Sequence, residues 1–299
     1  MKIANRDVLY NEISRFNPVT LEIAPGETFQ VQTELNTGGW LQHAEDVWSP
    51  EKQTASNPAS GCIAVQGAQP GHMLAVEILD IDLANVGYTA SSPSDSLYSP
   101  WLRKNEWGVI SKTVRIENGF VQWSDNINIP VHPMVGVVAT APAKGVPRNV
   151  ENGPYGGNMD IQEVTIGNTV YLPVFVERAL LHVGDVHAAM GDGEICGAGG
   201  IETRGTVTLR VTLHDQPPEM RWPRIETPEE IITVGCARPA EDAFRIALQE
   251  MILWMVHGYG FSEPEAFLLL GQILHARCTQ FVDPLYTYIC KVPKIYLNP

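Results

Sequence analysis

The sequence TRGTVTLRVTL, residues 203–213, alternates between apolar and polar side chains. Its apolar positions are Val207, Leu209, Val211 and Leu213, and Thr206, Thr208, Arg210 and Thr212 lie between them. Successive side chains of a β-strand point to opposite faces, so this period of two predicts a strand with one face in a core.

Similar patterns occur upstream of this segment. TFQVQTEL (28–35) and HMLAVEILDIDL (72–83) each follow a Pro-Gly turn, and TVYLPVFV (169–176) precedes the most polar part of the chain. WGVISKTVRIENGFVQW (107–123) predicts a hairpin that turns at Glu117-Asn118-Gly119. Residues 87–108 show no sustained period and predict a surface excursion, and the Pro/Gly-rich residues 133–157 predict a long irregular loop.

Helical periodicity is confined to the C-terminal third. PAEDAFRIALQEMILWMVHGYG (239–260) places apolar residues on one stripe, and its glycines predict the helix end. SEPEAFLLLGQIL (262–274) predicts a second helix, capped by Ser262 with Glu265. We therefore expect a mainly β protein: a β-sandwich or jelly-roll-like body over 1–215, and an α+β part over 216–299 with two packed helices. The two parts could also form one integrated domain.

The overall charge excludes some classes of partner. Acidic residues outnumber basic ones 34 to 20, giving a net charge of −14. This balance disfavours nucleic acid and anionic membrane surfaces, although it is compatible with cation binding. The N-terminus has no signal-like basic and apolar run, and no stretch of about 18 apolar residues could span a membrane. We therefore expect a cytoplasmic protein, with its five widely spaced cysteines reduced.

Chemistry-bearing residues concentrate in GPYGGNMD (153–160) and HVGDVHAAMGDGEICGAGGIE (182–202), the latter expected as a loop between strands. Asp185 and His187 are two positions apart, as are Asp192 and Glu194, so both pairs could face one cavity. Buried polar groups at this density need partners or a cation. Imidazole with carboxylates favours zinc, whereas an all-oxygen set would suit calcium or magnesium.

Each of these residues also has a simpler interpretation. Asp192 lies in a Gly-Asp-Gly string, which is commonly a tight turn. His182, between two apolar residues, is typical of a hydrogen-bonded core histidine. Cys196 could be a nucleophile, but free cysteines are usually small buried hydrophobic residues. Gly156-Gly157 could be a turn or could let backbone N–H groups approach a ligand.

The run from GGNMD through YLPVFV to GDVHAAMGDGEICGAGGIE resembles the signature of the acetamidase/formamidase family. Weaker similarity covers residues 57–81, HPMVGVVATAP (132–142) and CTQFVDPLYTYICKVPK (278–294). The resemblance implies hydrolysis of a short linear amide to ammonia and a carboxylate. It also implies a homo-oligomer and a bound divalent metal ion.

Five residues fall on the family's motif: Asp160, His187, Asp192, Glu194 and Glu202. Our hypothesis assigns roles to these five residues and to four others. The metal ligands would be Asp160, His187 and Glu202. Glu194 or Asp192 would be the general base towards a metal-activated water, with Asn158 or glycine N–H groups steadying the oxyanion. Gly157, Asp185 and Cys196 would contact the substrate, in a small apolar pocket that excludes long acyl chains.

Two positions depart from the family pattern: His72 stands where an acid is usual, and Asn36 stands where aspartate is expected. Either difference could change the metal or the substrate. Two alternatives to a short-amide hydrolase therefore remain. One is an amidohydrolase of the same scaffold with a different amide substrate, and the other is a non-enzymatic β-rich module that binds a divalent cation or ligand.

Overall fold

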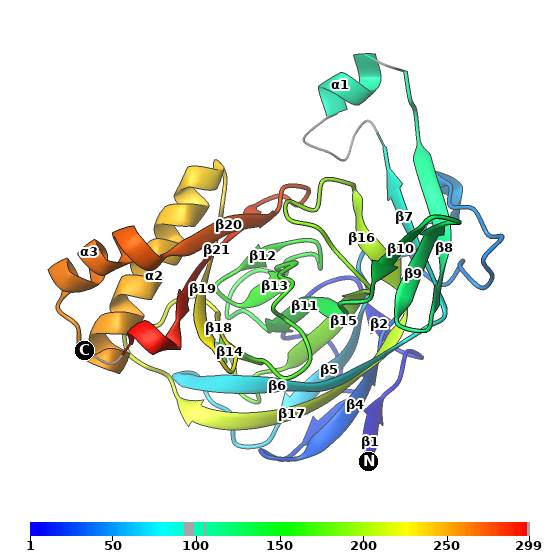
Figure 1. Cartoon of the computed structure of the whole chain (residues 1–299). Helices are drawn as coiled ribbons and strands as arrows, with labels where there is room; N and C mark the ends of the chain where they lie inside the picture. The colour runs from blue at the N-terminus through cyan, green and yellow to red at the C-terminus, as the bar shows by residue number, and fades with distance from the viewer. Residues whose placement is uncertain (93–98, 105, 298–299) are drawn as a thin grey trace.

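Two large β-sheets form the body of the protein in the computed structural model, which describes residues 1–92, 99–104 and 106–297 (Figure 1). The first is nine-stranded. In spatial order its strands are β1 (Lys2–Ala4), β4 (Thr28–Gln32), β17 (Gly205–Asp215), β6 (His72–Leu83), β14 (Thr169–Pro173), β18 (Arg224–Glu226), β19 (Glu230–Ala237), β21 (Tyr286–Pro293) and β20 (His275–Gln280). The long strands β6 and β17, whose alternation the sequence shows, pair antiparallel at its centre.

The second sheet carries most of the polar segments singled out in the sequence. Its main path is β10 (Ile127–Pro130), β9 (Phe120–Ser124), β8 (Ile110–Glu117), β7 (Val86–Ser91), β16 (Ala198–Thr203), β15 (Leu181–His187), β11 (Met134–Thr140), β13 (Gly156–Asn158) and β12 (Asn152–Gly153). Off this path, β5 (Ala59–Val65) pairs with β15, and β2 (Leu9–Tyr10) and β3 (Leu21–Ile23) pair with β5.

The main hydrophobic core lies between the two sheets. Phe29, Val76 and Leu209 contribute from the first sheet, and Val138 and Val183 from the second; each is at most 2% exposed. The long strands β6 and β17 alternate apolar and polar residues, so in this part of the first sheet one face is buried and the other is polar. This packing confirms the mainly β, two-sheet prediction.

Two C-terminal helices cover the part of the first sheet that ends in β19, β21 and β20 (Figure 1). Helix α2 (Ala240–Tyr259) packs Ala247 and Met251 against these strands and ends at Gly260, whose φ is 80°. Helix α3 (Glu263–Ile273) begins at Ser262, whose hydroxyl accepts a hydrogen bond from the Glu265 N–H. Both helix predictions are confirmed, including the capping residue. Short 3₁₀ turns occupy Pro50–Lys52 and Lys294–Tyr296.

Three predicted irregular segments contain strands. Residues 133–157 include β11, β12 and β13. The run Met134–Thr140 is a buried central strand, but the prolines and glycines around it suggested a loop. Residues 87–108 begin with β7, although helix α1 (Ser99–Lys104) does stand away from the body (Figure 1), and 93–98 and 105 lie outside the described residues. The stretch 182–202 lies on β15 and β16 apart from their connection.

The predicted hairpin at Asn118-Gly119 is confirmed. Strands β8 and β9 pair antiparallel with Glu117 opposite Phe120, and the turn residues Asn118 and Gly119 both have positive φ.

The predicted division at residue 215 falls within one continuous sheet, because β14 pairs with β18. That division therefore stays a prediction about folding units. Among the described residues, no helix has the length and apolar character needed to cross a membrane.

Candidate active site

Titratable side chains from five segments of the chain meet in one buried group, which we call the acidic cluster. Its members are Asp160 after β13, Asp185 and His187 on β15, Glu194 in the β15–β16 connection, Glu202 on β16 and Asp283 in the β20–β21 connection. None is more than 7% exposed. Burial of so many ionisable groups is costly unless they share protons or a cation.

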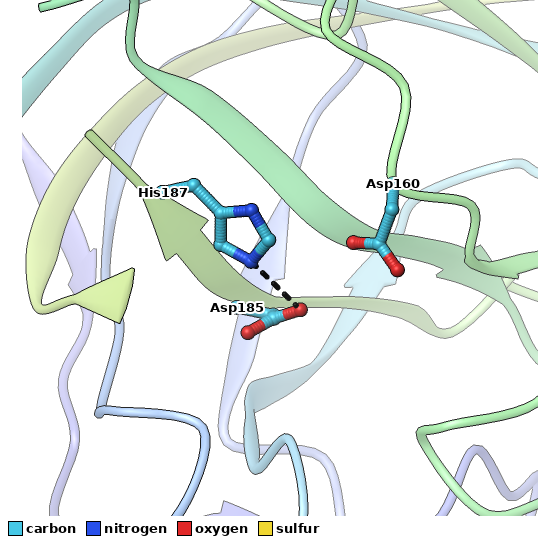
Figure 2. Close-up of side chains that lie close together, drawn as sticks. All are labelled: Asp160, Asp185 and His187. Atoms are coloured by element: carbon cyan, nitrogen blue, oxygen red, sulfur yellow. Dashed lines mark ion pairs between the residues drawn. The ribbon is translucent and has the colours of Figure 1, made fainter. Parts of the chain in front are cut away.

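Pairing within the second sheet brings the acidic cluster together. His187 lies opposite Glu202 in the β15–β16 register, and its Nε2 is 3.3 Å from Glu202 Oε1 and 3.5 Å from Asp185 Oδ2. One ligand atom each from Asp160, Asp185 and His187 lies within 4.8 Å of the others, as does one each from His187, Glu194 and Glu202. Figure 2 shows Asp160, which follows β13, close to Asp185 and His187, which both lie on β15, so Asp160 and His187 can share a ligand.

Gly136 makes this convergence possible. Strand β11 lies between β13 and β15, so its side chains could separate Asp160 from Asp185. At Gly136, an added Cβ would come within 3.0 Å of a carboxylate oxygen of each. Only glycine lets the two carboxylates approach across the intervening strand.

Replacing Gly136 with alanine should therefore displace the two carboxylates. We expect roughly 100-fold lower turnover, because shifts of about 1 Å in catalytic groups cost that much. Gly271→Ala is the control, because a Cβ at that position in α3 meets nothing within 4 Å. Steady-state kinetics of both variants checks this prediction, and a Gly136→Ala variant as active as Gly271→Ala would contradict it.

Three members of the acidic cluster have strained backbones. Asp160, Asp185 and Glu194 have φ values of 46°, 56° and 41°, in the left-handed region that non-glycine residues rarely adopt. Each such residue costs of order 1–3 kcal/mol, and they concentrate where function requires an otherwise unfavourable orientation. The strain turns carboxylates from separate segments toward one point.

Two asparagines hold the carboxylates in place. Asn158 Nδ2 donates to Asp160 Oδ2 at 2.7 Å and to Asp283 Oδ2 at 2.9 Å. Asn57 Nδ2 donates to Asp185 Oδ2 at 3.1 Å. Because both N–H groups of Asn158 are used, it positions carboxylates and has no donor left for an oxyanion.

The environment shifts the pKa values of the acidic cluster. Burial, reinforced by neighbouring acids, raises the pKa of Asp160, Glu194, Glu202 and Asp283. Burial alone would lower the pKa of His187, but Glu202 and Asp185 raise it well above its ordinary value. The cluster therefore favours bound positive charge, either protons or a cation.

A cavity of about 570 Å³ opens above the acidic cluster. Asp283 and Asn57 reach it from the cluster side, and Asn36, Arg148 and Arg238 also line it. This finding corrects the expected small apolar pocket: the cavity is large and mostly polar, because loops rich in Asn, Ser and Arg surround it rather than core strands.

A model of the acetamidase/formamidase family matches residues 3–155 and 143–295, almost the whole chain. The chain belongs to this family. The acetamidase of Bacillus halodurans is 31% identical, with 98% of each chain covered and a TM-score of 0.92. A structure from Thermoanaerobacter tengcongensis described as a predicted acetamidase/formamidase is 32% identical over 99% of this chain and 96% of that one, with a TM-score of 0.92.

The formamidase of Methylophilus methylotrophus is a more distant relative. It is 26% identical in an alignment of 255 positions, which covers 66% of this chain and 61% of that protein. The chain thus matches less than two thirds of the length of this curated relative, and the same holds for the acetamidase of Mycolicibacterium smegmatis, at 63%. Membership of the acetamidase/formamidase family accounts for the fold.

The residues present fit the divalent ion that acetamidase/formamidase membership implies. Several buried ligand atoms have no hydrogen-bond partner among the described residues. They are Asp160 Oδ1, Asp185 Oδ1, both ring nitrogens of His187, Glu194 Oε2 and Glu202 Oε2. Such atoms are rare in folded proteins unless a ligand satisfies them, and oxygens with one imidazole form a suitable donor set for zinc.

Three residues singled out in the sequence lie outside the acidic cluster. Asp192 is largely exposed, and its Oδ1 lies 2.7 Å from Arg277 Nε at a turn. Gly157 packs closely against the backbone of Glu151, away from the cavity. Cys196 is half-buried, burial raises the pKa of its thiol, and it does not line the cavity.

The two departures from the family pattern lie in different places. His72 accepts a hydrogen bond from the Gln69 N–H in the turn before β6, whereas Asn36 lines the cavity.

Sequence reasoning missed Asp283, Asn57 and Gly136. All three lie in the stretches of weaker family similarity, within CTQFVDPLYTYICKVPK, NPASG and HPMVGVVATAP. No local spacing connects them to residues 156–202, so their resemblance to family motifs was the one available signal. Strand pairing and the β20–β21 turn bring them to the site.

His182 is a core histidine, as its apolar neighbours predict. It is fully buried on β15, with Nε2 3.0 Å from Asn17 Nδ2 and Nδ1 3.0 Å from the Leu180 carbonyl. Burial lowers its pKa from 6.5 to about 4. The imidazole is therefore neutral in the folded protein at pH 7, with Nδ1 donating and Nε2 accepting.

This depressed pKa predicts acid sensitivity. Below pH 6.5 the unfolded chain gains a proton at His182 that the folded protein does not accept until about pH 4, so stability falls across that window. Between pH 7.5 and 5 we expect His182 to remove about 2 kcal/mol from the free energy of unfolding. Urea unfolding of wild type and His182→Gln at both pH values measures this, and an equal pH dependence in both would contradict it.

Proposed function

We propose that this chain is an amidase that hydrolyses the C–N bond of a short linear amide, formamide- or acetamide-like, to ammonia and a carboxylate. The acidic cluster, which reaches the cavity through Asp283, carries the proposal, since it unites candidate ion ligands with a buried proton-accepting group. Membership of the acetamidase/formamidase family supports the same reaction class.

Asp160, His187 and Glu202 would hold the divalent ion, which we propose to be zinc, with Asp185 beside them. His187 belongs to both groups of converging ligand atoms, so it is the natural centre of the set. A divalent cation supplies Lewis acidity here, making water more nucleophilic and the amide carbonyl more electrophilic near neutral pH. Calcium or magnesium would be better suited if the imidazole did not take part.

Glu194 is our candidate for the general base. It is 6% exposed, none of the described arginine or lysine side chains pairs with it, and burial raises its pKa well above the ordinary value. Such a carboxylate can take a proton from attacking water and deliver it to the leaving nitrogen, which must depart as ammonia because amide ion is too basic. Asp192 is unsuited to this role because its charge is engaged by Arg277.

Asn36 is our candidate for the oxyanion donor. Its Oδ1 accepts a hydrogen bond from the buried Tyr88 hydroxyl at 2.7 Å, which fixes the orientation of the amide. The Nδ2 group has no partner among the described residues, and the side chain lines the cavity while being 6% exposed. The aspartate that resemblance leads one to expect would have no N–H to donate.

Asn36→Ala should lower kcat by roughly 10²–10³-fold, the usual cost of losing one oxyanion donor. Tyr88→Phe should cause a smaller loss, because Asn36 remains but loses its orienting hydrogen bond. Steady-state kinetics on one amide checks both variants. Unchanged kcat in Asn36→Ala would exclude this role.

Ammonia release across formamide, acetamide, propionamide and butyramide tests the proposed function. We expect turnover of at least one of them, dependent on a divalent ion. If no amide reacts while the protein binds calcium tightly through oxygen ligands alone, the non-enzymatic cation-binding alternative is favoured. Turnover of a larger amide alone would favour the amidohydrolase alternative.

Location in the cytoplasm and assembly into a homo-oligomer also belong to this proposal. Helix α3 supports assembly, because it exposes Phe267 and Leu268 at 59% and 70%, and exposed apolar patches commonly mark interfaces. Light scattering of the purified protein tests this, and the mass of a single chain would contradict it. Fractionation of source cells tests the location.

A further inference from the structure

The cavity above the acidic cluster is larger than a formamide- or acetamide-like substrate needs. Its volume is about 570 Å³, within the roughly 300–1,000 Å³ typical of sites for much larger ligands. An amide of three or four heavy atoms would fill a small corner of it. The remaining space implies a substrate with a second recognised group, and the lining indicates its chemistry.

Arg238 lines this cavity next to Asp283, and most of its N–H donors are unused. Its Nη2 donates to the Asp283 carbonyl at 2.8 Å, and the guanidinium lies 4.2 Å from the centre of the Tyr286 ring. Among the described residues, no carboxylate lies within ion-pair distance of Arg238. The Asp283 carboxylate turns inward to Asn158 instead, so it does not neutralise the guanidinium.

A second arginine strengthens the positive character of the lining. Arg148 also lines the cavity, and its Nε is 3.0 Å from Glu151 Oε1, a largely exposed pair. Two guanidinium groups therefore line the cavity that the acidic cluster reaches through Asp283. An anionic group on a substrate would be repelled by the carboxylates of the acidic cluster and attracted to the guanidinium groups, which fixes its orientation.

We propose that this enzyme takes short amides that carry a carboxylate at the end opposite the amide group. The carboxylate binds Arg238, and the neutral amide lies against the acidic cluster. Guanidinium and carboxylate match as a planar two-bond pair, which gives geometry as well as charge. This inference rests on the proposed amide hydrolysis and adds the substrate class.

Asp283 links the two ends of such a site. Its backbone carbonyl binds Arg238, while its side chain belongs to the acidic cluster. One residue therefore connects the guanidinium to the acidic cluster, so a short substrate can reach both. Succinamate and glutaramate are short amides of this kind.

The test compares succinamate with butyramide, a neutral amide of matched length. Wild type should show at least roughly tenfold higher kcat/KM for succinamate, and Arg238→Gln should reduce that ratio roughly tenfold or more. Arg238→Lys should retain part of the ratio, because it keeps the charge but loses the two-bond geometry. The control is Arg245→Gln, because this exposed arginine on α2 pairs with Asp242 outside the cavity.

A wild-type ratio near one, or equal losses on both substrates in Arg238→Gln, would overturn the proposal. If formamide or acetamide is hydrolysed but succinamate is not, the proposal fails while the proposed function stands. If no amide is hydrolysed, the proposed function fails, and calorimetric titration with succinamate then tests the anion subsite separately. Saturable binding that Arg238→Gln abolishes and Arg245→Gln keeps supports the subsite. Binding that is absent, or equal in all variants, overturns it.

Discussion

Glu194→Gln is expected to lower kcat for amide hydrolysis by roughly 10²–10⁴-fold, the usual contribution of a general base. Glutamine keeps the shape of the side chain but cannot take a proton from water or deliver one to the leaving nitrogen. The KM should change little, because the substrate is bound by other groups. Steady-state kinetics together with metal analysis of the purified variant measures this effect.

Asp192→Asn is the matched control for Glu194→Gln. The two acids are two positions apart in the same β15–β16 connection, but Asp192 is exposed and paired with Arg277. Loss of an exposed ion pair costs at most about 1 kcal/mol of stability, so this variant should retain nearly full kcat. Full turnover in Glu194→Gln with the metal still bound, or a collapse in Asp192→Asn alone, would reverse the assignment.

His187→Ala should abolish both metal retention and activity. Both sets of converging ligand atoms contain His187, so its loss affects every candidate arrangement of the ion. The loss of affinity should exceed the roughly 10–100-fold that follows removal of an outer-shell partner. Elemental analysis of the protein, before and after dialysis against a chelator, measures retention.

The control for His187→Ala lies on the same strand. His182→Gln also replaces a fully buried histidine of β15, but its partners are Asn17 and the Leu180 carbonyl rather than the acidic cluster. This variant should keep its metal and its activity at neutral pH. Chelation of wild type should remove activity that zinc then restores, whereas full activity in verified metal-free protein would rule out the metal-dependent proposal.

Local sequence patterns predicted the strands and helices that bury only one of their faces. Strands β6 and β17 and helices α2 and α3 each place apolar residues with the period of their own backbone, so one face is buried. The same reasoning failed for β11, where Met134–Thr140 is buried on both faces and has no alternation. Proline and glycine at its borders then suggested a loop.

The sequence likewise predicted some residues of the candidate site and missed others. The run from 156 to 202 contains Asn158, Asp160, Asp185, His187, Glu194 and Glu202, all buried at the site. Proximity in sequence could not distinguish Glu194 from Asp192, because the turn at Gly193 buries one carboxylate and exposes the other. It also gave no indication of Asp283, which is about 80 residues further along the chain.

By itself, the sequence determined the β-rich class, the two helices and the segment that carries most of the chemistry, because these depend on neighbours along the chain. The tertiary structure alone decided which carboxylates share one space, that Gly136 must lack a side chain, and that Arg148 and Arg238 line the same cavity as Asp283. These properties depend on strand pairing and burial between distant segments. Distances across a sheet are set by hydrogen-bonded register, which no local pattern contains.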